Sequence, residues 1–134
     1  MNTDGIFPAE PLLTIVAAAR KVLHVLSPGL DQKAYARALV IELRKWNLSL
    51  ESDKVFEVRY EGHLVDVYVA PLVVDDTVLV DVRVAEGFGP TWLAQASGAL
   101  LLTQLNQALL LNFHRPELDW RPMQRLVVPD QRFA

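Results

Sequence analysis

Three successive runs of alternating apolar and polar residues, between residues 54 and 84, constrain the fold of this chain more than any other feature. In each run, valine or aromatic residues occupy every second position, and Glu61-Gly62 and Asp75-Asp76 separate the runs. Alternation of this kind is typical of strands with one buried face, and short polar or glycine-containing pairs are typical of the turns between them. The sequence therefore predicts three antiparallel strands at about residues 54–60, 64–70 and 77–84.

The segment before these strands follows the period of a helix instead. Apolar residues recur at three-and-four spacing across residues 12–26, and a Ser-Pro-Gly sequence then blocks continuation of this helix. Asp31 is placed to cap a second helix that runs to about Trp46. We therefore expect two amphipathic helices ahead of the strands.

After the strands, a glycine-proline break at residues 87–90 precedes a predicted helix at about residues 91–105. A strand at residues 108–113 and a short edge strand at residues 124–128 complete the prediction. The resulting order, α-α-β-β-β-α-β with a last β, predicts a mixed α/β domain in which helices flank one sheet. Since no repeat, low-complexity tract or linker interrupts the sequence, we expect a single domain over residues 1–134.

The composition excludes several classes of protein. Among 134 residues there is no cysteine, which excludes disulfide scaffolds, zinc ribbons and thiol nucleophiles and fits a reducing cytoplasm. The first residues lack the basic group of a secretory signal, and the uncharged stretch at residues 92–113 contains too many polar residues to span a membrane. We therefore expect a cytoplasmic protein without membrane contact.

Charge is unevenly distributed along the chain. The net charge is −3, but residues 51–90 alone carry nine acidic and three basic residues. Non-specific phosphate binding requires a broad surplus of lysine and arginine, whereas an acidic strand region attracts a cation and repels a bare phosphate backbone. Nucleic acid is therefore a partner that the sequence permits but does not favour.

Two carboxylates and a guanidinium are predicted to converge within this acidic region. If a loop of even length joins the second and third strands, residues whose numbers sum to an odd value lie opposite one another. Asp66 then shares a face with Asp81 and Arg83, because strand side chains repeat every two residues. A salt-bridged outer face of the sheet is the ordinary explanation of such a group. A cation site is the functional alternative.

A series of short motifs points to a known family. The motifs are Gly29-Leu-Asp-Gln32-Lys-Ala-Tyr35, Leu64-Val-Asp66-Val-Tyr-Val, Val80-Asp81-Val-Arg83, Gln95 with Leu100, Leu109-Leu-Leu-Asn112-Phe113, and Arg125. In this order and spacing they resemble the GxxExxY protein family over about residues 12–128. This family is a compact branch of the PD-(D/E)xK nuclease-like superfamily.

That resemblance implies a restriction-endonuclease-like core and a metal-dependent chemistry. In the family pattern, a helix carries a glutamate, and neighbouring strands carry an aspartate and then a Glu-x-Lys pair. Two carboxylates on neighbouring strands hold Mg²⁺, which takes phosphate oxygens directly, while the lysine positions or activates the attacking water. Mg²⁺ is therefore the cofactor that the resemblance implies.

The residues at these positions depart from the family pattern. Gln32 stands in place of the glutamate, Asp66 keeps the aspartate, and Asp81 is one methylene shorter than the family's second glutamate. Arg83 replaces the lysine, and its permanently charged planar fork favours pairing with a carboxylate over contact with a water. Asp66 and Asp81 are then the candidate Mg²⁺ ligands. Alternatively, Arg83 forms an ion pair with Asp66 or Asp81, and its guanidinium takes the place of the metal.

The departures extend to a further position, because the family usually carries histidine three residues before Gln95, where this chain has Trp92. Scaffold positions such as Asn112 and Phe113 match the family, whereas polar site positions differ. We therefore expect a degenerate, inactive nuclease fold that serves as an interaction or regulatory module. The alternative is a weakly active Mg²⁺- or Mn²⁺-dependent nuclease that uses the two aspartates, assisted by Gln95 and Arg83.

The apolar content also suggests self-association. Hydrophobic residues make up 51% of the sequence, which is high for a small chain, and a monomer is not expected to cover all of them. The residues on which this expectation rests are Val73, Val74, Phe88, Trp92 and Trp120. We therefore expect a homodimer.

Overall fold

The structure, a computed structural model, describes residues 10–126. Within them it contains three helices and five strands in the predicted order. These elements are α1 (Glu10–Leu26), α2 (Gln32–Arg44), β1 (Leu50–Tyr60), β2 (His63–Val74), β3 (Val78–Arg83), α3 (Pro90–Thr103), β4 (Gln107–Asn112) and β5 (Asp119–Gln124). This is the mixed α/β fold that the family resemblance implies.

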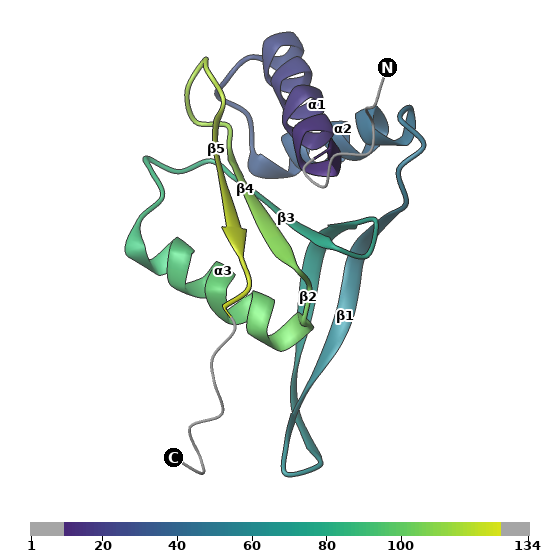
Figure 1. Cartoon of the computed structure of the whole chain (residues 1–134). Coiled ribbons are helices and arrows are strands. Elements are labelled where there is room, and N and C mark those ends of the chain that lie inside the picture. Colours follow the sequence, from purple (N-terminus) through teal and green to yellow (C-terminus); the bar gives the residue numbers. More distant parts are fainter. Residues whose placement is uncertain (1–9, 127–134) are drawn as a thin grey trace.

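All five strands form one sheet, in the order β1-β2-β3-β4-β5 (Figure 1). β1, β2 and β3 are consecutive antiparallel strands, as predicted from their alternation. β4 lies parallel to β3, and α3 makes the crossover connection that a parallel pair requires. β5 lies antiparallel to β4. The sheet is therefore mixed, with its one parallel pair inside it.

Helices cover both faces of the sheet. α1 and α2 pack on one face, in the core that contains Val78, Val80 and Val82 of β3. α3 packs on the opposite face, where Leu79 and Leu110 lie in a second core. Because side chains of a strand point alternately to its two faces, β3 supplies both cores and the molecule has three layers (Figure 1). Within residues 10–126, no helix combines the length and the apolar character needed to cross a membrane.

An aromatic pair ties the turn between α1 and α2 to the core. Tyr35 and Phe113 are fully buried, and their rings stack with centroids 4.7 Å apart. The Tyr35 hydroxyl donates to the carbonyl of Ser27 at 2.7 Å and accepts from the amide of Leu30 at 3.0 Å. These contacts fix the start of α2, and hence the position of Gln32.

The last strand lies earlier than the sequence predicts, at Asp119–Gln124 rather than at residues 124–128. Gln124 pairs with Gln107, the first residue of β4, so the ladder between the two strands ends there. Pro122 is tolerated because β5 is the edge strand of the described sheet. Residues 127 and 128 of the predicted strand lie outside the described residues.

Apolar residues expected at a self-association surface lie mostly in the core. Val73, Val74 and Trp92 have exposed fractions of 1%, 0% and 4%. Phe88 and Trp120 are partly buried against the two cores. Helices on both faces of the sheet cover these side chains, so they do not provide a surface for a second copy.

Candidate functional site

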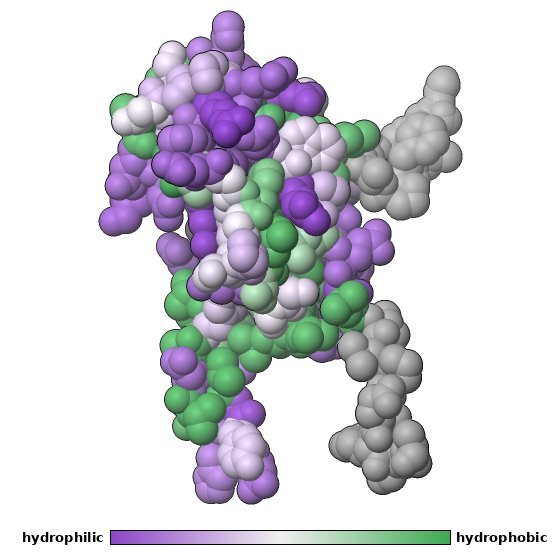
Figure 2. All heavy atoms as spheres, turned by 90° about the vertical axis from the view of Figure 1, so that its left-hand side faces the viewer, coloured by the Kyte–Doolittle hydropathy of each residue, from purple (hydrophilic) through white to green (hydrophobic). Residues whose placement is uncertain are grey.

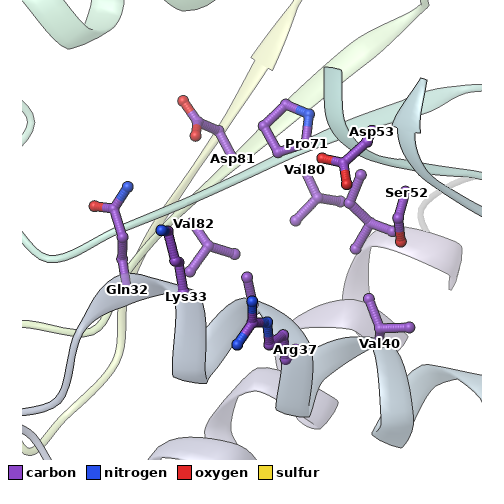
Figure 3. A pocket seen from close by; sticks show the side chains of 12 residues that line it. Gln32, Lys33, Arg37, Val40, Ser52, Asp53, Pro71, Val80, Asp81 and Val82 are labelled. Atoms are coloured by element: carbon purple, nitrogen blue, oxygen red, sulfur yellow. The ribbon is translucent and has the colours of Figure 1, made fainter. Parts of the chain in front are cut away.

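A cavity of about 340 Å³ lies between α2 and strands β1, β2 and β3. Gln32 and Asp81, two of the predicted site residues, both line it (Figure 3). Lys33 and Arg37 of α2 and Asp53 of β1 line it as well. Figure 3 shows Gln32 and Asp81 at one end of this cavity and Asp53 at the other. The cavity therefore carries two carboxylates and two cationic side chains.

Asp81 and Arg83 form an ion pair on β3. Arg83 Nη2 lies 3.1 Å from Asp81 Oδ2, and Arg83 Nε donates to the same oxygen at 3.2 Å. Residues two apart on a strand point to the same face, which brings these side chains together. Arg83 also donates to Oε1 of Gln95 on α3 at 3.0 Å. The predicted pairing of Asp81 with Arg83 is therefore present, and Gln95 belongs to the same group.

Trp92 completes this group. Its indole N–H donates to Asp81 Oδ2 at 2.9 Å, and the Arg83 guanidinium lies 4.9 Å from the centre of its ring. A guanidinium over an indole face is attracted by the ring, more strongly where water is partly excluded. The side chains of Asp81 and Arg83 are only 18% and 33% exposed. Trp92 thus contacts both members of the ion pair.

Asn112 holds the end of β3 in place. It lies opposite Arg83 in the parallel ladder and is 1% exposed. Its side-chain amide donates to the carbonyl of Ala85 at 2.8 Å, and its side-chain oxygen accepts from the Ala85 amide at 3.0 Å. One side chain thereby satisfies both backbone groups of a residue that has just left the sheet, which fixes the path of the chain after Arg83.

The register of β2 and β3 differs from the predicted one, and it determines how far Asp66 lies from Asp81. Leu72 pairs with Val80, so paired residue numbers in this ladder sum to an even value rather than an odd one. The cause is the connecting loop, residues 75–77, which has an odd number of residues. Asp66 lies farther along β2, outside the ladder with β3 and opposite Val58 of β1.

Pro71, and not Asp66, stands across from Asp81. Pro71 directly precedes Leu72, which pairs with Val80, the residue before Asp81. Pro71 and Asp81 also line the same cavity (Figure 3). Asp66 is farther along β2 by about 17 Å at the rise of an extended strand. It is exposed, and its carboxylate accepts from the amide of Val67. Asp66 alternates with Tyr68 and Ala70, which pack in the core under α3, so it keeps the predicted face of Asp81. At this separation along the strand, however, the two carboxylates are too far apart to bind one ion.

These residues do not fit a Mg²⁺ ion of the kind that the resemblance implies. Mg²⁺ takes oxygen ligands at about 2.1 Å, commonly from one or two carboxylates. Here Asp81 Oδ2 already accepts from Arg83 and Trp92, and the positive guanidinium adjoins it. Pro71 and Gln32 supply no charge to the cavity. Among residues 10–126, no three histidine or acidic side chains gather where they could share an ion.

Sequence reasoning missed four residues that line the cavity. Lys33 and Arg37 are four apart on α2, a spacing that places them on one helix face and could have been noticed. Asp53 has a left-handed backbone, with φ of 53°, and no partner in the ladder of β1 with β2. Nothing in the alternating pattern indicates that irregularity. Pro71 could be placed opposite Asp81 only from the register.

The family model of the PD-(D/E)XK nuclease superfamily matches residues 10–125, which is nearly all of the described chain. The chain belongs to this superfamily. No curated protein and no solved structure matches it significantly. The element order agrees with a PD-(D/E)XK fold.

Tyr68 provides a test of which aspartate lies beside Arg83 in this member of the PD-(D/E)XK superfamily. It lines a second cavity, of about 300 Å³, together with Asp81 and Arg83. Burial, and then the Asp81 carboxylate, raise the pKa of the Tyr68 phenol above its ordinary value of 10.0, against an opposing effect of Arg83. Asp81→Asn should lower that pKa, as followed by the ultraviolet absorbance of the phenolate. Asp66→Asn is the comparison, because Asp66 is not among the charges that shift the pKa of Tyr68, and equal shifts in both variants would contradict the effect assigned to Asp81.

Proposed function

We propose that this chain is a degenerate member of the superfamily, of GxxExxY type, without useful phosphodiesterase activity. The observation that supports this proposal is the occupation of Asp81 Oδ2 by Arg83 and Trp92. Metal-assisted hydrolysis needs an ion held by carboxylates and a group that activates or orients water. Arg83 stays protonated at any working pH and therefore cannot serve as the base.

The proposed role of the remaining scaffold is that of an interaction or regulatory module. Hydrogen bonds link Asp81, Arg83, Trp92 and Gln95 to one another, so this group stabilises the contact of α3 with β3 rather than preparing a reaction. A chain without cysteine suits a reducing compartment, and we place the protein in the cytoplasm. Nucleic acid is not favoured as the partner, because two carboxylates on the strands offset the two cationic side chains of α2 at the cavity.

A titration with Mg²⁺ or Mn²⁺, combined with a cleavage assay, tests the loss of activity. Wild-type protein should give no heat of cation binding and should cleave single- and double-stranded DNA no faster than Asp81→Asn does. The physical reason is that a cation would have to displace a guanidinium held by three groups. Cation-dependent cleavage that Asp81→Asn abolishes would overturn the proposal.

A variant designed to create a metal site provides a stricter test. Pro71→Asp combined with Arg83→Lys places a second carboxylate across from Asp81 and removes the planar fork. We expect this double variant to bind Mn²⁺ in calorimetry, and we expect Asp66→Asn in the same background to leave that binding unchanged. Circular dichroism checks that each variant folds. Loss of Mn²⁺ binding on adding Asp66→Asn would contradict the assignment.

A further inference from the structure

The hairpin of β1 and β2 extends beyond the rest of the sheet (Figure 1). β2 pairs with β3 only through Leu72, Val73 and Val74, so residues 63–70 have a strand neighbour on one side only. β1 is itself an edge of the sheet. The outer part of the hairpin is therefore a two-stranded ribbon with both edges open. Such a ribbon is marginally stable in water unless another layer covers it.

One face of this ribbon consists of exposed valines. Val65, Val67 and Val69 alternate along β2, and Val55 pairs with Val69 across the ribbon, so all four point to one face. Their exposed fractions run from 46% to 60%. We call these four residues the valine face. On the other face, Phe56 and Tyr68 pack against the core under α3.

Figure 2 shows the ribbon as a coloured projection from the body, with hydrophobic residues along it. The rest of the sheet has α1 and α2 on one side and α3 on the other. Within the described residues, the valine face takes part in neither core. Monomeric proteins rarely expose contiguous apolar surface of this kind unless it binds something.

We propose that the valine face binds a second copy of this chain, face to face about a two-fold axis. The inference rests on the proposed function, since it names the surface and the partner of the interaction module. Two sheets that pack face to face interdigitate the side chains of their inner faces. In a two-fold dimer the same patch covers itself, so each ribbon gains from its partner the layer that it lacks.

The charges of this face suit a partner of the same kind. Glu57 pairs with Val67 across the ribbon and is the acidic residue on the valine side. Arg59 donates to its carboxylate through Nη2 at 2.8 Å and through Nε at 3.1 Å. Like charges meet in a two-fold dimer, and this ion pair leaves no net charge to repel. A strongly acidic or basic partner would find no complementary charge here.

The available area is that of a small interface. Full burial removes about 100 Å² of apolar surface for an aliphatic side chain. At their observed exposures, the valine face and Leu64, which pairs with Arg59 on the same side, leave roughly 270 Å² uncovered. Since interfaces are about 57% apolar, this corresponds to roughly 470 Å² per partner. A standard interface buries about 800 Å² per partner, so a weak dimer is expected.

Sedimentation equilibrium of the full chain tests the inference. Between about 1 and 300 µM, wild-type protein should form a weak dimer, with a Kd on the order of 100 µM, as expected for this area. Val67→Lys places a charge in the middle of the valine face and should raise the Kd at least about tenfold. Val25→Lys is the matched control, because Val25 is a 68% exposed valine on α1. Its Kd should stay within about twofold of wild type.

Val67→Thr keeps the β-branched shape and guards against misfolding of the lysine variant. It should weaken the dimer while the circular dichroism spectrum stays that of wild type. A monomer over the whole concentration range, or equal Kd values for Val67→Lys and Val25→Lys, would overturn the inference. A monomer that binds no Mn²⁺ refutes the interface alone. A dimer that cleaves DNA refutes the loss of activity alone.

Discussion

Phe113→Ala should cost the protein about 3–5 kcal/mol of unfolding free energy, which is the usual loss for truncating a buried phenylalanine. Phe113 is fully buried, and its ring stacks on Tyr35 with an angle of 15° between the planes. Its truncation leaves a cavity between α2 and the end of β4 that close packing does not fill. A domain of this size is stable by about 5–15 kcal/mol, so the variant should be close to unfolding at physiological temperature.

Urea denaturation followed by circular dichroism measures this loss. Phe56→Ala is the matched control, since Phe56 is a partly buried phenylalanine of the ribbon and packs on the second core only from one side. It should lose about 1 kcal/mol, since this side chain keeps contact with solvent and its truncation leaves no enclosed cavity. Equal losses in the two variants would show that the Tyr35–Phe113 stack does not anchor α2.

Asn112→Leu should cost about 3 kcal/mol, because it leaves buried backbone groups without partners. The Asn112 side chain satisfies the amide and the carbonyl of Ala85, and its oxygen also accepts from the amide of His114 at 3.2 Å. Leucine fills a similar volume, so the loss reports the missing hydrogen bonds rather than a cavity. The chain after Arg83 should also become less ordered, which increases its rate of amide hydrogen exchange.

Asn106→Leu provides the comparison for this substitution. Asn106 is exposed at the start of the β4 segment, and no hydrogen bond of its side chain is present in the described structure. Its replacement should change the unfolding free energy by less than about 0.5 kcal/mol. A loss of unfolding free energy comparable to that of Asn112→Leu would mean that leucine is poorly tolerated throughout this segment. That result would contradict the role assigned to the Asn112 hydrogen bonds.

The strand meander could be predicted from the sequence because alternation is a local property. Each side chain of β3 is directed by its own position in the strand, so the faces of Asp81 and Arg83 followed without knowledge of any neighbour. Gln32 and Asp81 were selected as site residues from the family resemblance, and both line the cavity. These predictions depend on residue spacing within one strand or on a motif shared with a known family.

The position of Asp66 could not be predicted in the same way, since it depends on the register between two strands. A single residue in the loop at residues 75–77 decides which residues lie opposite one another. β2 also runs well beyond its ladder with β3, and alternation alone does not show where pairing stops. The burial of Val73 and Trp92 was missed for a related reason, because it depends on where α3 packs.

β4 pairs with β3 only after the crossover through α3 is in place, whereas short turns join β1, β2 and β3. Contacts between segments distant in sequence form more slowly than local ones, so the hairpin should fold early and the parallel pair late. Trp92 lies within the crossover and Asp81 precedes it, which makes their hydrogen bond one of the last contacts to form. During refolding, the fluorescence of Trp92 would therefore report completion of the sheet. By then the hairpin, with its exposed valine face, would already have formed and could contact other chains.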